Sequence, residues 1–230
     1  MLRSHPLVNT LLDLEGNPRA CVWTEPLFGI PLQLYTPYIS LYMVALGVTE
    51  SQIGLIASIS MLLQVFWALL SGAITDKFGR KRTTLIADII AWSIPCLIWA
   101  FSQNFTHFLI AAIVNSSWRV AGNSWNCLLV EDSDPDQLVD IFSWTYIAGL
   151  LAAFVAPLAG VLIARYGLVP TVRGLYLLAF VMMTTKFFGV GCTGHRDSPR
   201  RDPAKRDRQH QYHGFGQTIW WSISTHIENT

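Results

Sequence analysis

The sequence predicts an all-α membrane protein, a six-transmembrane-helix bundle. Three observations support this fold class. The 230 residues are 52% apolar and only 13% charged, whereas ordinary soluble domains are roughly 25% charged. Six apolar segments reach the length of about 20 residues that a membrane-spanning helix needs. The charged residues gather between those segments. The composition therefore indicates a membrane protein and not a soluble enzyme with a large core.

The predicted spans follow one another with short connections, so neighbouring spans should pack antiparallel. They cover residues 26–47, 51–75, 83–102, 106–130, 137–164 and 171–192. Pro31 and Pro37 can bend the first span. Thr49 and Gln52 have capping-box spacing before the second. The fifth is longer than a bilayer requires and should tilt or project past the surface. Pro170 opens the sixth.

The distribution of Lys and Arg predicts a multi-pass protein of the plasma membrane with a cytoplasmic N-terminus. With this orientation the inner segments hold twelve cations, whereas the outer loops hold only Arg165 and Arg173. Short cytoplasmic loops are enriched in such cations. The loop at 131–136 is acidic and also falls inside, but acidic residues contribute little to this rule.

Three parts are expected along the chain. Residues 1–25 form a cytoplasmic N-terminal segment, residues 26–192 the six-helix transmembrane bundle, and residues 193–230 a basic cytoplasmic loop or tail. The first segment contains five charged residues and no long apolar run before a small-residue cleavage site. We therefore expect no cleavable signal peptide.

A basic turn between the second and third spans carries a specific spacing of glycines and charges. It reads G-x-x-x-D-K-x-G-R-K-R from Gly72 to Arg82. This spacing resembles the signature between helices 2 and 3 of the major facilitator superfamily of secondary transporters. All six defining positions are filled: Gly72, Asp76, Lys77, Gly79, Lys81 and Arg82. The resemblance extends over about residues 20–210.

The resemblance implies a fold and a function. Members have twelve helices in two six-helix bundles joined by a long cytoplasmic loop, so this chain resembles the first bundle, with its two three-helix repeats, and the start of that linker. Such proteins move a small solute by alternating access, with the substrate site between the halves. The implied partners are membrane lipid, a small-molecule substrate, and a second six-helix half or a homodimer partner. Coupling to an ion or proton gradient is expected.

The resemblance also implies a conformational latch at the basic turn. In the family, the acidic residue and the cations of this turn form a charge network that holds one state. Asp76 can accept hydrogen bonds at the start of helix 3, where the helix dipole favours an anion. Glu131 and Asp132, at the cytoplasmic end of helix 4, are candidate partners of Arg80. Alternatively, Lys77, Lys81 and Arg82 only fix topology and contact anionic lipid. The predicted latch comprises Gly72, Asp76, Lys77, Gly79, Arg80, Lys81, Arg82, Glu131 and Asp132.

The fourth span carries a polar stripe. Asn115, Arg119, Asn123 and Asn126 recur at i, i+4, i+8 and i+11, on one face of a helix. Arg119 lies near the bilayer centre, where an arginine costs about 2.5–3.5 kcal/mol on insertion scales. It should therefore face a watery cavity or a partner. The resemblance implies that helices 1 and 4 line the cavity and that an arginine in helix 4 serves proton coupling or anion binding. A structural polar anchor between helices is the alternative.

Other polar residues in the spans leave both interpretations open. Tyr35, Tyr38 and Tyr42 share one face of the first span, and we expect Tyr35 and Tyr38 either to line the substrate cavity or to pack between helices. Asp88 lies near the inner surface, and we expect it either to find a structural partner, which is favoured, or to serve a substrate role. Lys186 can snorkel toward the inner surface.

The sequence predicts neither an enzyme nor a nucleic-acid-binding protein. The four cysteines have no metal-ligand or redox spacing, and no serine or cysteine lies in a nucleophile context. We expect no metal site and no cofactor. The predicted function is secondary active transport. The alternative is a non-transporting six-helix scaffold or regulatory half-protein that needs a partner.

Overall fold

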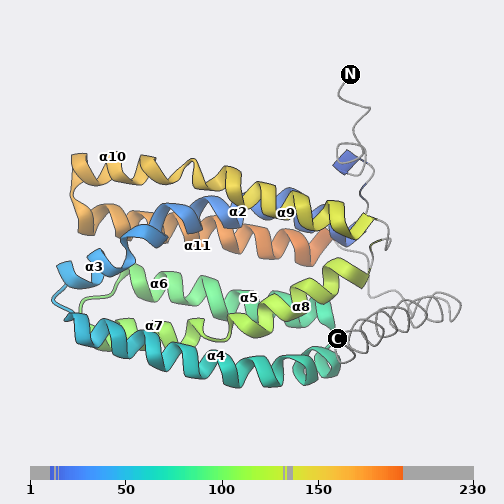
Figure 1. The fold of residues 1–230 in the computed structure, drawn as a ribbon, viewed down its shortest axis with the longest axis horizontal. Coiled ribbons are helices and arrows are strands. Elements are labelled where there is room, and N and C mark those ends of the chain that lie inside the picture. The colour runs from blue at the N-terminus through green and yellow to red at the C-terminus, as the bar shows by residue number, and fades with distance from the viewer. Residues whose placement is uncertain (1–10, 13, 15, 132, 134–136, 194–230) are drawn as a thin grey trace, which may run out of the picture. The chain divides into compact units, whose positions relative to one another are not determined.

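The computed structural model describes residues 11–12, 14, 16–131, 133 and 137–193. They lie in the first of two units, Met1–His195, whereas the second, Arg196–Thr230, lies outside the described residues. Within the described part every element is a helix (Figure 1). The elements are α2 (Gly16–Tyr35), η2 (Thr36–Tyr38), α3 (Ile39–Ala45), α4 (Glu50–Phe78), α5 (Arg80–Asp88), η3 (Ile89–Ser93), α6 (Ile94–Ala100), α7 (Phe105–Asn115), α8 (Trp118–Glu131), α9 (Leu138–Ala153), α10 (Ala156–Tyr166) and α11 (Leu168–Thr193).

Four helical runs in the described part are long and apolar enough to cross a membrane. They are Glu50–Phe78, Arg80–Ala100, Leu138–Tyr166 and Leu168–Val190. These runs coincide with the second, third, fifth and sixth predicted spans. The fifth is 29 residues long, which agrees with the expectation of a span longer than a bilayer requires.

The first predicted span is interrupted. Helix α2 begins at Gly16, well before the predicted start at residue 26, and continues through Pro26 and Pro31 to Tyr35. The break follows in η2, which contains Pro37, and α3 then resumes the helix. Proline lacks a backbone N–H and clashes with the preceding turn, so it interrupts a helix. Of the two prolines expected to bend this span, Pro37 marks the break.

The fourth predicted span is also divided, between α7 and α8. The hydroxyl of Ser116 donates to the carbonyl of Ile113 at 2.6 Å, and that of Ser117 donates to Val114 at 2.8 Å. Side-chain bonds of this kind compete with the backbone ladder and bend helices. The break therefore lies immediately before α8, near the middle of the span.

The third predicted span contains an irregular turn. Element η3 is π-helical and follows directly after Asp88, the last residue of α5. The side-chain amide of Asn115, at the end of α7, donates to the carbonyl of Ala91 in η3 at 2.7 Å. Insertions of this type often occur at functional sites because they redirect the side chains around them. The irregular turn of the third span thus contacts the break in the fourth.

Helix α4 has the start that the sequence predicts and a sharper end. The backbone N–H of Thr49 donates to Gln52 Oε1 at 3.0 Å, and the N–H of Gln52 donates to Thr49 Oγ1 at 3.3 Å. This confirms the capping box. Helix α4 ends at Phe78 and α5 begins at Arg80, so Gly79 alone connects them, with φ of 81°. Glycine suits this position because other residues rarely adopt positive φ.

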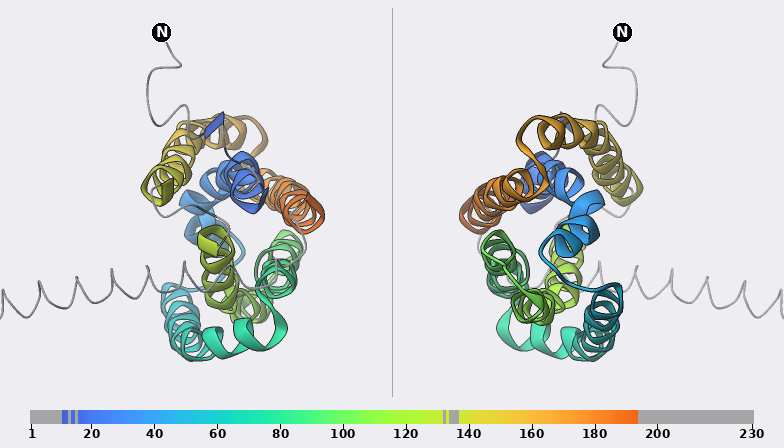
Figure 2. Two further views of the ribbon diagram at one scale, coloured as in Figure 1. Left: turned by 90° about the vertical axis from the view of Figure 1, so that its right-hand side faces the viewer. Right: turned by 90° about the vertical axis from the view of Figure 1, so that its left-hand side faces the viewer.

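The helices pack in two groups, which Figure 2 shows end-on. In one group α2 packs against α9 and α11, and in the other α8 packs against α4 and α5. Contacts of α11 with α6 and η3 join the groups. The core at this junction is aromatic: the ring of Tyr176 in α11 lies 4.8 Å from that of Tyr35, 5.9 Å from Tyr42 and 5.5 Å from Trp99. Such ring pairs each stabilise a fold by about 0.5–1.5 kcal/mol beyond burial.

A close approach of α2 to α9 yields a stability prediction. A Cβ added to Gly29 would lie 3.2 Å from Cβ of Ala152, so Gly29→Leu should push the two helices apart. We expect a loss of about 1–3 kcal/mol, typical of overpacking, measured as a lower melting temperature in detergent. The matched control is Gly149→Leu in α9, where an added Cβ meets nothing within 4 Å. Equal melting temperatures for the two variants would contradict the close packing at Gly29.

Candidate functional site

A buried ion pair joins α2 to α11. Nζ of Lys186 donates to Oε2 of Glu25 at 2.6 Å, and the two side chains are 6% and 15% exposed. The structure contradicts the prediction that Lys186 reaches the inner surface, because its amine turns inward to a partner. Glu25 is absent from the predicted site residues because it falls in the predicted N-terminal segment, whereas α2 already begins at Gly16. One signal in the sequence could have pointed to Glu25: the sixth predicted span contains a lysine, and a cation within a span needs a partner of opposite charge.

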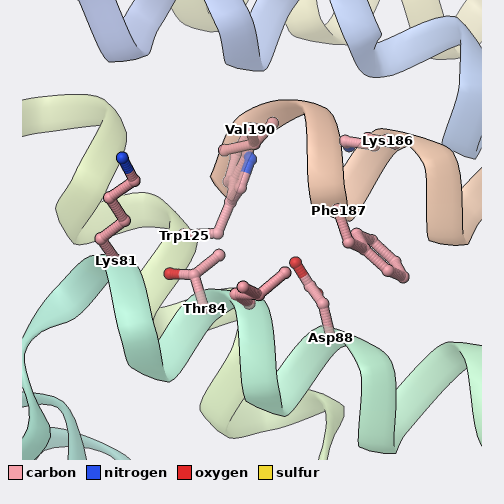
Figure 3. Close-up of a pocket in the computed structure, with 8 residues that line it drawn as sticks. Lys81, Thr84, Asp88, Trp125, Lys186, Phe187 and Val190 are labelled. Atoms are coloured by element: carbon pink, nitrogen blue, oxygen red, sulfur yellow. The ribbon is translucent and has the colours of Figure 1, made fainter. Parts of the chain in front are cut away.

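Aromatic rings and a third ionisable group surround the pair. Nζ of Lys186 lies 4.8 Å from the ring centre of Phe28 and 5.7 Å from that of Trp125, close enough for cation–π attraction. Asp88 of α5 extends toward α11 across a small cavity of about 10 Å³ (Figure 3). It interacts electrostatically with both Lys186 and Glu25. Asp88 therefore faces the interior of the bundle, opposite the ammonium group. The cavity is lined by Lys81, Thr84, Leu85, Asp88, Trp125, Lys186, Phe187 and Val190.

Arg119 is exposed on α8, at the second residue after the break. Its guanidinium carbon lies 4.1 Å from the ring centre of Trp118. The ring of Trp118 is 6.4 Å from that of Trp92, which in turn lies 4.9 Å from Phe28. Phe28 also contacts the amine of Lys186. A row of three aromatic rings therefore connects the exposed guanidinium to the buried ammonium.

The predicted polar stripe divides at the helix break. Asn115 turns inward and bonds the backbone of η3, whereas Arg119 and Asn126 are exposed and Asn123 is half-buried. The expectation of one continuous face assumed an unbroken helix. The break at Ser116 and the following residue changes the relative orientation of Asn115 and the three residues of α8.

The tyrosines of the first span differ in their surroundings. Tyr35 and Tyr42 are buried in the aromatic core, and the hydroxyl of Tyr42 donates to the carbonyl of Trp99 at 3.0 Å. Tyr38 is half-buried. The position of Tyr35 agrees with the packing alternative that the sequence left open.

The basic turn is distributed over two helix ends. Lys77 lies in the last turn of α4, and its Nζ is 5.6 Å from the ring centre of Phe78. Arg80, Lys81 and Arg82 form the first turn of α5. The carbonyl of Arg80 accepts hydrogen bonds from Ser124 of α8 at 2.7 Å and from Thr84 at 2.8 Å, which fixes α5 against α8.

The proposed latch has no ion pair at Asp76 within the described residues. Gly72 and Asp76 are exposed near the end of α4. Glu131 ends α8, but its side chain and the whole of Asp132 lie outside the described residues. The latch stays a prediction.

An apolar groove of about 270 Å³ lies between α2 and α9. The indole rings of Trp23 and Trp144 line it together with aliphatic side chains. Its lining is almost free of polar atoms, so it suits an apolar or aromatic molecule. In the described part of the chain, no group of three or more His, Cys, Asp or Glu side chains could hold a metal ion.

Comparison with known proteins gives consistent relatives. The family model described as Major Facilitator Superfamily matches residues 27–210. The multidrug resistance protein MdtG of Serratia proteamaculans (strain 568) is 28% identical over 183 residues, which cover 73% of this chain and 43% of MdtG. The multidrug efflux pump Tap of Mycobacterium bovis (strain BCG / Pasteur 1173P2) is 24% identical over 171 residues, covering 66% of this chain and 40% of Tap. The chain thus spans about two fifths of the length of these relatives. Because the family model covers well over half of the sequence, the chain belongs to the Major Facilitator Superfamily.

Proposed function

We propose that the chain is the N-terminal six-helix half of a secondary active transporter that moves a small solute by alternating access. The observation that carries the proposal is Arg119, a guanidinium exposed on α8 near the middle of the fourth predicted span. A cation at that depth is costly against lipid and normally faces a water-filled cavity or a protein partner. The face of α8 that presents Arg119 is therefore the proposed cavity wall, completed by a second half.

The packing supports an arrangement of two three-helix repeats. The first predicted span packs through α2 against α9 and α11, which belong to the fifth and sixth spans. The fourth packs through α8 against α4 and α5, which belong to the second and third. This reciprocal exchange is what a repeat of three spans produces, and repeats of this kind are common in secondary transporters. We place all six spans in the plasma membrane with the N-terminus cytoplasmic.

The proposed substrates are amphipathic organic compounds, moved outward and driven by a proton or other ion gradient. The names of the relatives state multidrug resistance and multidrug efflux. The groove between α2 and α9 offers an apolar, indole-lined surface of about 270 Å³, and the exposed guanidinium on α8 offers a polar contact. Apolar walls with a few placed polar groups are typical of small-molecule sites.

The test is accumulation of ethidium in cells that lack their own drug pumps and express the protein from its own gene. We expect less ethidium than in cells with empty vector, and loss of that difference when a protonophore collapses the proton gradient. Membrane insertion is checked by fractionation, and ethidium-dependent thermal stabilisation is measured on the purified protein. An inserted protein that leaves ethidium at the vector level, and whose stability ethidium does not change, would favour the non-transporting scaffold.

A further inference from the structure

Three ionisable side chains from three different helices lie close together in the bundle. Glu25 and Asp88 follow the first residues of α2 and α5 by two to three helical turns, and Lys186 precedes the last residue of α11 by about two turns. Each distance is roughly 10–14 Å at 1.5 Å per residue. The ends concerned are those predicted to face the cytoplasm. Two carboxyl groups therefore lie near one ammonium group. With all three ionised, the cluster carries a net charge of −1.

The short contact within the cluster decides which groups neutralise each other. Lys186 is 2.6 Å from Glu25, a distance typical of a charge-assisted hydrogen bond between an ammonium and a carboxylate. The negative charge of the pair therefore lies on Glu25. Asp88 faces the same ammonium across the cavity and has no ion pair with any residue that the structure describes. Asp88 is half-buried, and an unpaired carboxylate with restricted access to water is disfavoured, so the usual relief is protonation.

Among the described residues around the cavity, no side chain forms an ion pair with Asp88. From α8 the cavity receives only the uncharged Trp125. From α2 the nearest further titratable group is the buried thiol of Cys21. Lys81, on the same helix as Asp88, lines the cavity but extends toward α8 (Figure 3). The cavity of about 10 Å³ has room for one water at most, which the indole N–H can bind.

We propose that Glu25, Lys186 and Asp88 form a proton-binding site that holds one exchangeable proton, carried by Asp88 in this conformation. Binding converts the Asp88 carboxylate and a hydronium ion into a carboxylic acid and water, and release reverses this. The site does not depend on the proposed transport function, because a proton binds here whether or not a solute moves.

Proton release would change the contacts between the spans. An ionised Asp88 competes with Glu25 for Lys186, so the ammonium can leave α2 for α5. Element η3 begins directly after Asp88, and Trp92 within it belongs to the ring row that ends at the guanidinium of Arg119. The two ionisation states thus favour different contacts of the first span with the third and sixth.

Infrared spectroscopy of the purified full chain tests the proposal. The sample is dissolved in a detergent without ester groups, so that lipid carbonyls do not hide the C=O stretch of a protonated carboxylic acid. We expect this band at neutral pH, its loss as the pH is raised, and a shift when aspartate is labelled with ¹³C at the side-chain carboxyl. Asp88→Asn should lack the band. Glu25→Gln should also lack it, because Asp88 then ionises and pairs with Lys186.

Glu50→Gln provides the matched control, since Glu50 is an exposed carboxylate in the first turn of α4. It should retain the band at wild-type intensity. A wild-type spectrum without a titrating carboxylic-acid band would overturn the proposal. So would a band that survives in both Asp88→Asn and Glu25→Gln. If Asp88→Asn does not fold, the spectra of the labelled wild type and of Glu25→Gln still test the proposal. Failure of the ethidium assay alone leaves these spectra unaffected, so the two proposals fail separately.

Discussion

Lys186→Met should destabilise the folded chain strongly, by more than either Glu25→Gln or Gly29→Leu. The change leaves Glu25 without a counter-charge inside the bundle, and removing one partner of a buried ion pair costs about 3–5 kcal/mol. The cation–π contact with Phe28 at 4.8 Å is lost as well, which adds about 0.5–2 kcal/mol. The measurement is the free energy of unfolding in mixed micelles, followed by the loss of helical circular dichroism.

Lys77→Met is the matched control for that substitution. Lys77 also lies beside a phenylalanine ring, with Nζ 5.6 Å from the centre of Phe78, but it is exposed at the end of α4. Surface substitutions of this kind usually change stability by less than about 0.5 kcal/mol. If Lys186→Met is no more damaging than Lys77→Met, the ion pair does not hold α2 to α11.

The partner substitutions should differ in a diagnostic way. Glu25→Gln should cost less than Lys186→Met, because Asp88 can take over the pairing with the ammonium. The double variant Glu25→Gln/Lys186→Met should be more stable than the sum of the two single effects predicts, since it removes both charges together. Residues in direct contact show such coupling, commonly about 0.5–3 kcal/mol. Additive effects would indicate that the two side chains do not interact in the folded chain.

The helices could be predicted from local signals in the sequence, whereas the long-range contacts could not. The capping box at Thr49 and Gln52 could be read because both partners lie within one helical turn. The pair of Glu25 and Lys186 spans 161 positions of the chain, and no periodicity connects such distant residues. A search for apolar spans also excluded Glu25, because a charged residue marks the edge of an apolar segment. When two charges neutralise each other inside the bundle, a charged residue can lie within the embedded part of a helix and does not mark its edge.

The polar stripe of the fourth span shows the same limit. Its period assumed a continuous helix, and the two serines at 116–117 break the helix at the point where the stripe passes through it. The position of Arg119 near the middle of the span could be predicted from spacing alone. Its stacking on Trp118 and the row of rings toward α2 depend on the packing of α8 against its neighbours, which the sequence does not state.

Arg119→Ala should abolish solute transport while leaving membrane insertion intact. The exposed guanidinium on α8 makes no ion pair with the residues that the structure describes, so its removal should change stability little. Within the proposed cavity, however, it is a cationic group on α8 that can bind an exchanging anion or serve proton coupling. The expected result is ethidium accumulation at the level of empty vector, with normal amounts of protein in the membrane fraction.

Two further variants decide what the arginine contributes. Arg165→Ala is the matched control, because Arg165 is also exposed and stacked on the neighbouring ring, at 5.4 Å from the centre of Tyr166, but lies at the end of α10. It should transport like the wild type. Arg119→Lys keeps the charge but loses the planar guanidinium that stacks on Trp118. Lysine does not fully replace arginine at a stacked site. We therefore expect partial transport. Wild-type efflux by Arg119→Ala would remove the cavity assignment, because no transported solute or coupling ion would then depend on the face of α8 that carries the charge.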